Sequence, residues 1–115
     1  MSAVPAVQAL SADVCVAAQL APEAMAWAAQ AGFKSVVNNR PDFEGGPDQP
    51  TSAAIEAAAI AAGLRYVHQP VLPAVQTAND FARFAALLAE LPKPILAFCR
   101  TGTRSGKLFR GATGA

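Results

Sequence analysis

The sequence predicts an α/β protein with three layers, in which helices cover both faces of a mainly parallel sheet of about four to five strands. Short apolar runs typical of strands alternate along the chain with alanine-rich or amphipathic runs typical of helices. Such alternation favours parallel strands joined by helical crossovers. A third observation is the segment 95–109, where a fully apolar run ends at a cysteine and a loop containing glycine and arginine follows.

Prolines, glycines and capping residues set the order of the elements. Pro22 suits the first turn of a helix, where its missing N–H has no partner to lose, and Gly32 and Gly63 are natural helix ends. Thr77 and Asp80 have the spacing of a capping box that opens an amphipathic helix. The expected strands are residues 4–10, 14–18, 34–39, 65–71 and 95–98, and the expected helices are residues 22–31, 51–62 and 77–91, with a further helix after the cysteine loop.

Length, composition and charge limit the range of functions. A chain of 115 residues that is 53% hydrophobic and 15% charged is expected to form one domain over residues 1–115. Its net charge of +1 gives no attraction to nucleic acid or to a membrane surface, and no stretch reaches the roughly 18 apolar residues of a membrane span. The first residues do not resemble a secretory signal, so we expect a cytoplasmic protein in which Cys15 and Cys99 are free thiols.

Neither a metal nor a cofactor is expected. Two distant cysteines and the single His68 do not have the spacing of a zinc site. The segment from Gly102 to Lys107 imitates a nucleotide-binding loop, but only three residues separate its glycines, and Leu108 stands where Ser or Thr would bind magnesium.

The loop after residue 98 is expected to bind an anion. Backbone N–H groups in a tight loop before a helix converge on one point, and together with nearby arginines they favour a thiolate at Cys99. Gly102 allows a backbone conformation that a side chain would forbid, and Thr103 or Ser105 could donate a hydroxyl to the sulfur. The expected site consists of the catalytic residues Cys99 and Arg104 and the anion-binding residues Arg100, Thr101, Gly102, Thr103, Ser105 and Arg40. For Arg40, an ion pair with Asp42 or Glu44 is an equally good interpretation.

The loop CRTGTRS resembles the active-site loop of rhodanese-type sulfurtransferases, which reads cysteine-arginine-x-glycine-x-arginine-serine. The stretches QLAPEAMAWAAQAGFKSVVNNRPD, QPTSAAIEAAAIAAGLRYVHQPV and ILAFCRTGTRS resemble a family of small bacterial domains called β-lactamase hydrolase-like. This resemblance implies a fold like that of protein-tyrosine and dual-specificity phosphatases. Members are labelled sulfurtransferases or phosphatases, and some are fused to sulfide- or persulfide-metabolising enzymes, which implies docking on such an enzyme.

Loop length separates those two activities in this interpretation. In cysteine phosphatases five residues separate the cysteine from the arginine, whereas four separate Cys99 from Arg104. A shorter loop encloses a smaller anion, such as the terminal sulfur of a persulfide. We therefore expect a sulfurtransferase in which the Cys99 thiolate takes sulfur from thiosulfate or a persulfide and passes it to a thiol or cyanide, while Arg100 and Arg104 orient the donor.

Two alternatives remain open. One is a cysteine phosphatase or hydrolase acting on phosphoesters, for which the sequence lacks a clear general acid: PVLPAVQ contains no aspartate, Asp80 is better explained as a cap, and Asp42 is the other candidate. The second is a non-enzymatic sulfur carrier or redox module. Gly106, Gly111 and Gly114 also predict a poor final helix, which is either short by nature or cut short in this chain.

Overall fold

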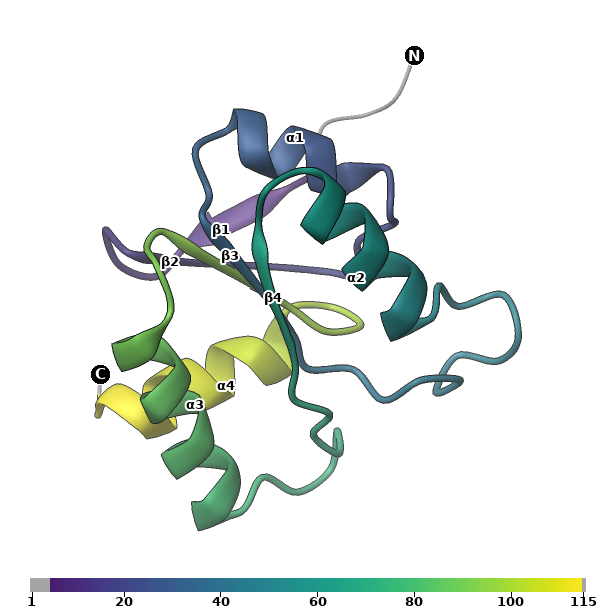
Figure 1. The fold of residues 1–115 in the computed structure, drawn as a ribbon. Coiled ribbons are helices and arrows are strands. Elements are labelled where there is room, and N and C mark those ends of the chain that lie inside the picture. The colour runs from purple at the N-terminus through teal and green to yellow at the C-terminus, as the bar shows by residue number, and fades with distance from the viewer. Residues whose placement is uncertain (1–4, 115) are drawn as a thin grey trace.

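The structure, a computed structural model, describes residues 5–114, in which strands and helices alternate as expected (Figure 1). The strands are β1 (Val7–Ala9), β2 (Val14–Ala17), β3 (Ser35–Asn38), β4 (Arg65–His68) and β5 (Ile95–Phe98), and the helices are α1 (Ala24–Gln30), α2 (Ser52–Ala61), α3 (Ala78–Glu90) and α4 (Thr103–Thr113). Val4, where the sequence predicts the first strand to begin, lies outside the described residues.

The strands form one sheet in the order β1-β2-β5-β3-β4. Only the edge strand β1 runs antiparallel to its neighbour; β5 pairs in parallel with both β2 and β3, which confirms the mainly parallel sheet. The register pairs Phe98 with Ala17 on one side and with Asn38 on the other, so three strands end at the same level. Residues that follow β2, β3 and β5 therefore meet at one edge of the sheet.

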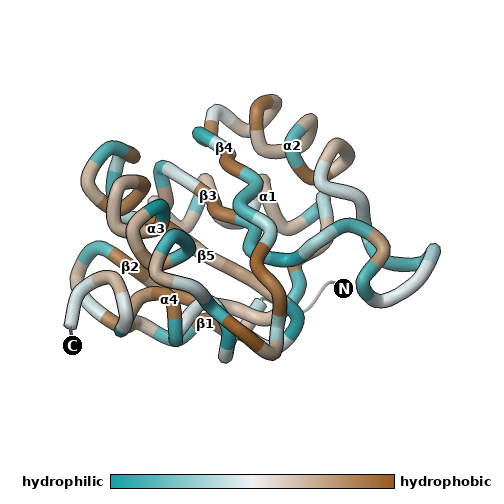
Figure 2. The backbone as a smooth tube through the Cα atoms, turned by 90° about the horizontal axis from the view of Figure 1, so that it is seen from below, coloured by the Kyte–Doolittle hydropathy of each residue, from teal (hydrophilic) through white to brown (hydrophobic). Residues whose placement is uncertain are grey.

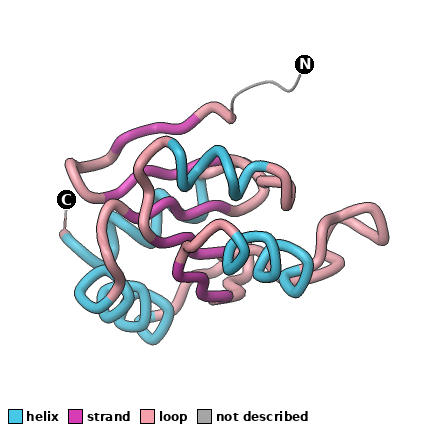
Figure 3. Tube along the Cα trace, turned by 45° about the horizontal axis from the view of Figure 1, so that its top comes forward, coloured by secondary structure: helices cyan, strands magenta, loops and turns pink. Residues whose placement is uncertain are grey.

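Helices cover both faces of this sheet and give the expected three layers (Figure 3). On one face, Met25 and Ala28 of α1 and Ile55 of α2 belong to one buried apolar cluster. On the other face, Phe84 of α3 and Leu108 of α4 belong to a second cluster. The hydrophobic strands β3 and β5 run between the two helical layers (Figure 2). No helix in the described part of the chain is long and apolar enough to cross a membrane.

The prediction of a poor final helix is wrong, because α4 continues from Thr103 to Thr113 despite its glycines. A Cβ atom at Gly111 would overlap the ring of Phe81 on α3, so the missing side chain is what lets the two helices pack closely. Gly106 is buried within α4. Packing against α3 outweighs the low helix propensity of glycine, roughly 1 kcal/mol per residue.

Candidate active site at the Cys99 loop

Cys99 follows β5 directly and is buried, with 1% of its surface exposed. Helix α4 begins four residues later, after a loop that turns at Gly102 with a φ of 92°. That left-handed conformation suits glycine, and a Cβ there would lie 3.4 Å from the carbonyl carbon and oxygen of Ala17. The turn points the Gly102 N–H at the sulfur, to which it donates at 3.1 Å.

The surroundings of Cys99 favour its thiolate. Burial opposes ionisation and is the largest single influence, but the N–H groups of Ser105, Thr101 and Gly102 and the Ser105 hydroxyl together outweigh it. The net result is that the pKa of the Cys99 thiol lies below its ordinary value. These donors come from both the loop and the first turn of α4, as expected for an anion cradle at a helix start.

The Ser105 hydroxyl has one proton, and two acceptors compete for it. It donates to Oδ1 of Asn39 at 2.8 Å, while also lying against the Cys99 sulfur. Asn39 is fixed in this orientation because its Nδ2 donates to the Gln69 carbonyl at 3.2 Å and its backbone N–H donates to the Phe98 carbonyl at 2.8 Å. We therefore attribute the stabilisation of the thiolate chiefly to the three backbone N–H groups.

Arg104 is buried beside the cradle, with 6% exposure. Its Nη1 donates to the Val71 carbonyl and to Oε2 of Glu44, each at 3.0 Å, and its Nη2 donates to Oε1 of Glu44 at 3.0 Å. Its Nε is buried and has no hydrogen-bond partner among the described residues. Because buried polar groups are rarely left unpaired, this N–H is an exception, as is Oε1 of Gln69.

Arg40 meets the same carboxylate from the other side. Its Nε donates to Oε1 of Glu44 at 2.9 Å and its Nη1 donates to Oε1 of Gln19 at 3.1 Å, so the ion pair that the sequence left open is present with Glu44. Gly45 makes room for this guanidinium, since a Cβ there would lie 2.6 Å from Nη2. Burial would raise the pKa of Glu44, but hydrogen bonds from Arg104 and Arg40 lower it overall, so its carboxyl stays ionised.

Two hollows that share lining residues open at the cradle. The smaller, of about 150 Å³, is lined by Pro73, Cys99, Arg100, Thr101, Thr103, Arg104 and Lys107. The larger, of about 500 Å³, shares three of these residues and is lined by Arg40, Glu44, Gly45, Pro73, Arg100 and Arg104. All the expected site residues except Gly102 and Ser105 border one of these hollows. Gly102 and Ser105 instead contact the Cys99 sulfur through their N–H groups.

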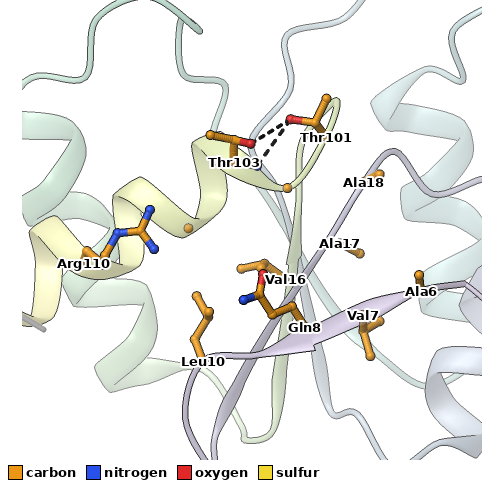
Figure 4. Close-up of a pocket in the computed structure, with 12 residues that line it drawn as sticks. Ala6, Val7, Gln8, Leu10, Val16, Ala17, Ala18, Thr101, Thr103 and Arg110 are labelled. Carbon is orange, nitrogen blue, oxygen red and sulfur yellow. Dashed lines mark hydrogen bonds between the residues drawn. The ribbon is translucent and has the colours of Figure 1, made fainter.

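A third hollow, of about 390 Å³, lies between β1–β2 and α4 (Figure 4). Its walls are mainly aliphatic, with Gln8 and Arg110 as the polar side chains beside the loop threonines, and Cys99 is not among its lining residues. Figure 4 also shows Thr101, whose Oγ1 donates to Oγ1 of Thr103 at 3.1 Å, so the Thr103 hydroxyl pairs with Thr101 and not with the sulfur. The candidate site therefore consists of the two hollows that Arg104 borders.

Both candidate acids of the sequence are engaged elsewhere. Oδ1 of Asp42 accepts a hydrogen bond from the Ser52 N–H at 2.7 Å, and Oδ2 of Asp80 accepts one from the Thr77 N–H at 2.9 Å within the capping box. Among residues 5–114 no group of three His, Cys, Asp or Glu side chains could hold a metal ion. The carboxylate at the site is instead Glu44, which the sequence offered only as a partner for Arg40.

Known proteins have sequences similar to that of this chain. A protein of Agrobacterium fabrum called "Beta-lactamase hydrolase-like protein" is 41% identical over 78 residues, which are 68% of this chain and 18% of that protein. A protein of the same name from Xylella fastidiosa is 38% identical over 81 residues, 70% of this chain and 19% of its own length. The chain therefore spans about one-fifth of the length of the curated relatives it matches.

Solved structures share the fold of this chain, and one of them is a candidate phosphatase. The crystal structure of a candidate phosphatase from Neisseria meningitidis superposes with a TM-score of 0.82 and 33% identity, over 95% of this chain and 75% of that one. P. aeruginosa TpbA in complex with pTyr superposes with a TM-score of 0.61 and 19% identity, over 90% of this chain and 61% of that one. The second likeness shows the fold alone.

The sulfurtransferase prediction is wrong, and the phosphatase alternative fits the findings better. The Neisseria meningitidis neighbour is a candidate phosphatase, and none of the proteins described above is named a rhodanese. The prediction failed because it took loop length as a measure of anion size. The donors to the sulfur come from Thr101, Gly102 and Ser105, on both the loop and α4, so the four residues before Arg104 do not alone define the cradle.

The phosphatase-like character is also that of the chain's own family. Residues 6–113 match the family described as "Beta-lactamase hydrolase-like protein, phosphatase-like domain". The match includes the whole cradle, the Glu44 loop and all nine helices and strands of the described residues. This chain is therefore a member of the β-lactamase hydrolase-like family, phosphatase-like domain.

Proposed function

We propose that this chain is a cysteine-dependent phosphatase that hydrolyses small phosphate monoesters, with Cys99 as nucleophile and Arg104 as the residue that holds the phosphoryl group. One observation supports this most directly: a thiol whose pKa is lowered by three N–H groups lies beside a buried arginine whose Nε has no partner. A tetrahedral phosphoryl group supplies acceptors for all four donors.

The first step is an in-line displacement at phosphorus. The Cys99 thiolate forms the P–S bond as the P–O ester bond breaks, and the leaving oxygen keeps the electron pair. The N–H groups of Thr101, Gly102 and Ser105 and the Nε of Arg104 bind the equatorial oxygens, which carry the charge of the transition state. Water then attacks phosphorus in the second step and breaks the P–S bond, which returns the thiolate. One proton of this water stays on the inorganic phosphate, and the other passes to solvent, from which the leaving oxygen of the first step takes its proton.

The other predicted site residues have supporting roles in this proposal. Arg100 and Thr103 border the entrance to the cradle, and Arg40 holds Glu44 against Arg104. A reducing compartment such as the cytoplasm suits this chemistry, since the free thiol of Cys99 must stay reduced. We treat residues 1–115 as one domain for this activity.

The test is hydrolysis of p-nitrophenyl phosphate by the wild-type chain and by Cys99→Ser, with Cys15→Ser as the matched control. We expect Cys99→Ser to abolish turnover and Cys15→Ser to retain it, because Cys15 lies within β2, away from the cradle. Rapid acid quenching followed by intact-mass spectrometry should detect phosphocysteine in the wild-type chain and in Cys15→Ser, but not in Cys99→Ser. Turnover that persists in Cys99→Ser would exclude the proposal.

A further inference from the structure

We infer that the substrate carries a second anionic group next to the scissile phosphoryl group, and that Arg100 and Lys107 bind it. This inference deepens the proposed phosphatase function and rests on it. It names the substrate class as small polyanionic phosphoesters, such as bisphosphates or phosphorylated carboxylic acids, and not phosphotyrosine in a peptide.

The first argument is the composition of the hollow at Cys99. Three of its seven lining residues are cations, namely Arg100, Arg104 and Lys107. Its remaining lining residues are Pro73, the two threonines and Cys99, so it contains neither a carboxylate nor an aromatic ring. A phosphotyrosine ring would find no aromatic partner there, whereas an anion would find an excess of positive charge.

The second argument is that Glu44 neutralises only part of this charge. It accepts hydrogen bonds from Arg40 and Arg104, the two arginines that are buried. Arg100 and Lys107 are exposed, and neither forms an ion pair with any of the described residues. Two free cations thus remain at the entrance after the phosphoryl group has taken the Nε of Arg104 and the N–H groups of the loop.

The third argument concerns geometry. Arg100 is the first residue after the nucleophile, and its carbonyl accepts a hydrogen bond from the Gln19 N–H at 3.2 Å, so the backbone from which its side chain projects is held. Lys107 lies one helical turn after Thr103, on the part of α4 that borders the same hollow. The two side chains therefore border the same hollow, Arg100 from the loop and Lys107 from the helix.

Matched substrates test the inference. Phenyl phosphate and 3-carboxyphenyl phosphate differ by one carboxylate near the phosphoryl group. We expect the wild-type kcat/KM to be about tenfold higher for the carboxylated substrate, as for a charge-assisted contact at a partly exposed site. The double variant Arg100→Gln/Lys107→Gln should reduce this ratio to about one. Arg65→Gln should keep it, because Arg65 is exposed at the opposite end of the sheet.

A binding measurement separates this inference from the proposed function. Calorimetric titration with pyrophosphate and with inorganic phosphate, on Cys99→Ser, needs no turnover. We expect pyrophosphate to bind about tenfold more tightly, and the added variants Arg100→Gln/Lys107→Gln to remove that preference. If neither aryl phosphate is hydrolysed but this preference is present, the phosphatase proposal fails and the two-anion site stands.

Three results would overturn the inference while leaving the phosphatase intact. They are equal kcat/KM for the two aryl phosphates, a preference that survives in the double variant, and faster turnover of a phosphotyrosine peptide than of 3-carboxyphenyl phosphate. Thermal unfolding of each variant serves as the folding control.

Discussion

Replacing Glu44 with glutamine tests whether one carboxylate holds both buried arginines in place. Oε1 accepts from Arg40 at 2.9 Å and from Arg104 at 3.0 Å, and Oε2 accepts from Arg104 at 3.0 Å. Glutamine retains one acceptor oxygen, so at least one of these three hydrogen bonds is lost and the others lose their charge. The Arg40 and Arg104 side chains, 9% and 6% exposed, then face each other without a counter-ion.

The expected loss of stability follows from these contacts. Hydrogen bonds to charged groups each contribute roughly 1.5–3 kcal/mol net, so the loss of one of the three would cost about that much if water replaced none of it. The Glu44 side chain is 20% exposed, and water partly replaces the lost interactions. We therefore expect Glu44→Gln to lower the free energy of unfolding by about 1–2 kcal/mol at pH 7.

The pH dependence gives a second, independent signature. The pKa of Glu44 is lower in the folded chain than in the unfolded chain, so its ionised form stabilises the fold above the unfolded pKa. That contribution is lost as the pH falls through the folded pKa. The wild-type and Glu44→Gln chains should therefore differ in stability at pH 7 and become alike at acid pH.

Urea denaturation followed by circular dichroism at several pH values measures both effects. Asp48→Asn is the matched control, because Asp48 is exposed on the same loop and its removal costs the same charge. Equal unfolding free energies for wild type and Glu44→Gln at pH 7 would refute the argument, as would a difference that does not change with pH.

Three further predictions concern the cradle and its supporting helix. Iodoacetamide should alkylate Cys99 with a half-maximal rate at a lower pH than a free thiol, because the loop N–H groups stabilise the thiolate, whereas burial raises the pKa of Cys15 and should shift its half-maximal rate to a higher pH. Peptide mass spectrometry distinguishes the two cysteines. A half-maximal rate for Cys99 at a higher pH than for a free thiol would contradict the cradle. Gly102→Ala should lower the free energy of unfolding in urea by about 1–2 kcal/mol, because alanine is strained at a φ of 92°. It should also raise the pKa of the Cys99 thiol, because it disturbs the Gly102 N–H that donates to the sulfur. An unchanged pH dependence of Cys99 alkylation would argue against that contact. Gly111→Ala should lower the unfolding free energy by about 1–3 kcal/mol through overlap with Phe81, while leaving the pKa of the Cys99 thiol unchanged. An unchanged unfolding free energy would mean that α3 and α4 can move apart to admit the methyl group at no cost.

Local signals in the sequence were sufficient for most of the fold. The apolar run between Pro94 and Cys99 predicts β5, and the Thr77–Asp80 capping box marks the start of α3 where the structure has it. The order of the strands needed the structure, because β5 pairs with segments that lie about 60 and 80 residues earlier in the chain. The length of α4 also escaped prediction, since it depends on packing against α3 and not on helix propensity.

The site was predictable only where its residues are contiguous. Cys99, Arg104 and the residues between them share one loop, whereas Arg104 meets Glu44 across 60 residues of sequence. Asn39, whose Oδ1 accepts a hydrogen bond from the Ser105 hydroxyl, is 66 residues away from Ser105. These long-range contacts arise because β2, β3 and β5 end at one level of the sheet, and the carboxyl ends of parallel strands are where such sites form.

The same contacts explain why the number of loop residues is a poor guide to the chemistry. Glu44 and the Val71 carbonyl occupy Nη1 and Nη2 of Arg104 and leave its Nε as the buried donor without a partner. The position of this N–H is thus fixed by two segments outside the loop before any anion binds. Because a donor fixed in advance needs no reorganisation when charge develops, the width of the site depends on where those segments hold Arg104, and not on how many residues precede it.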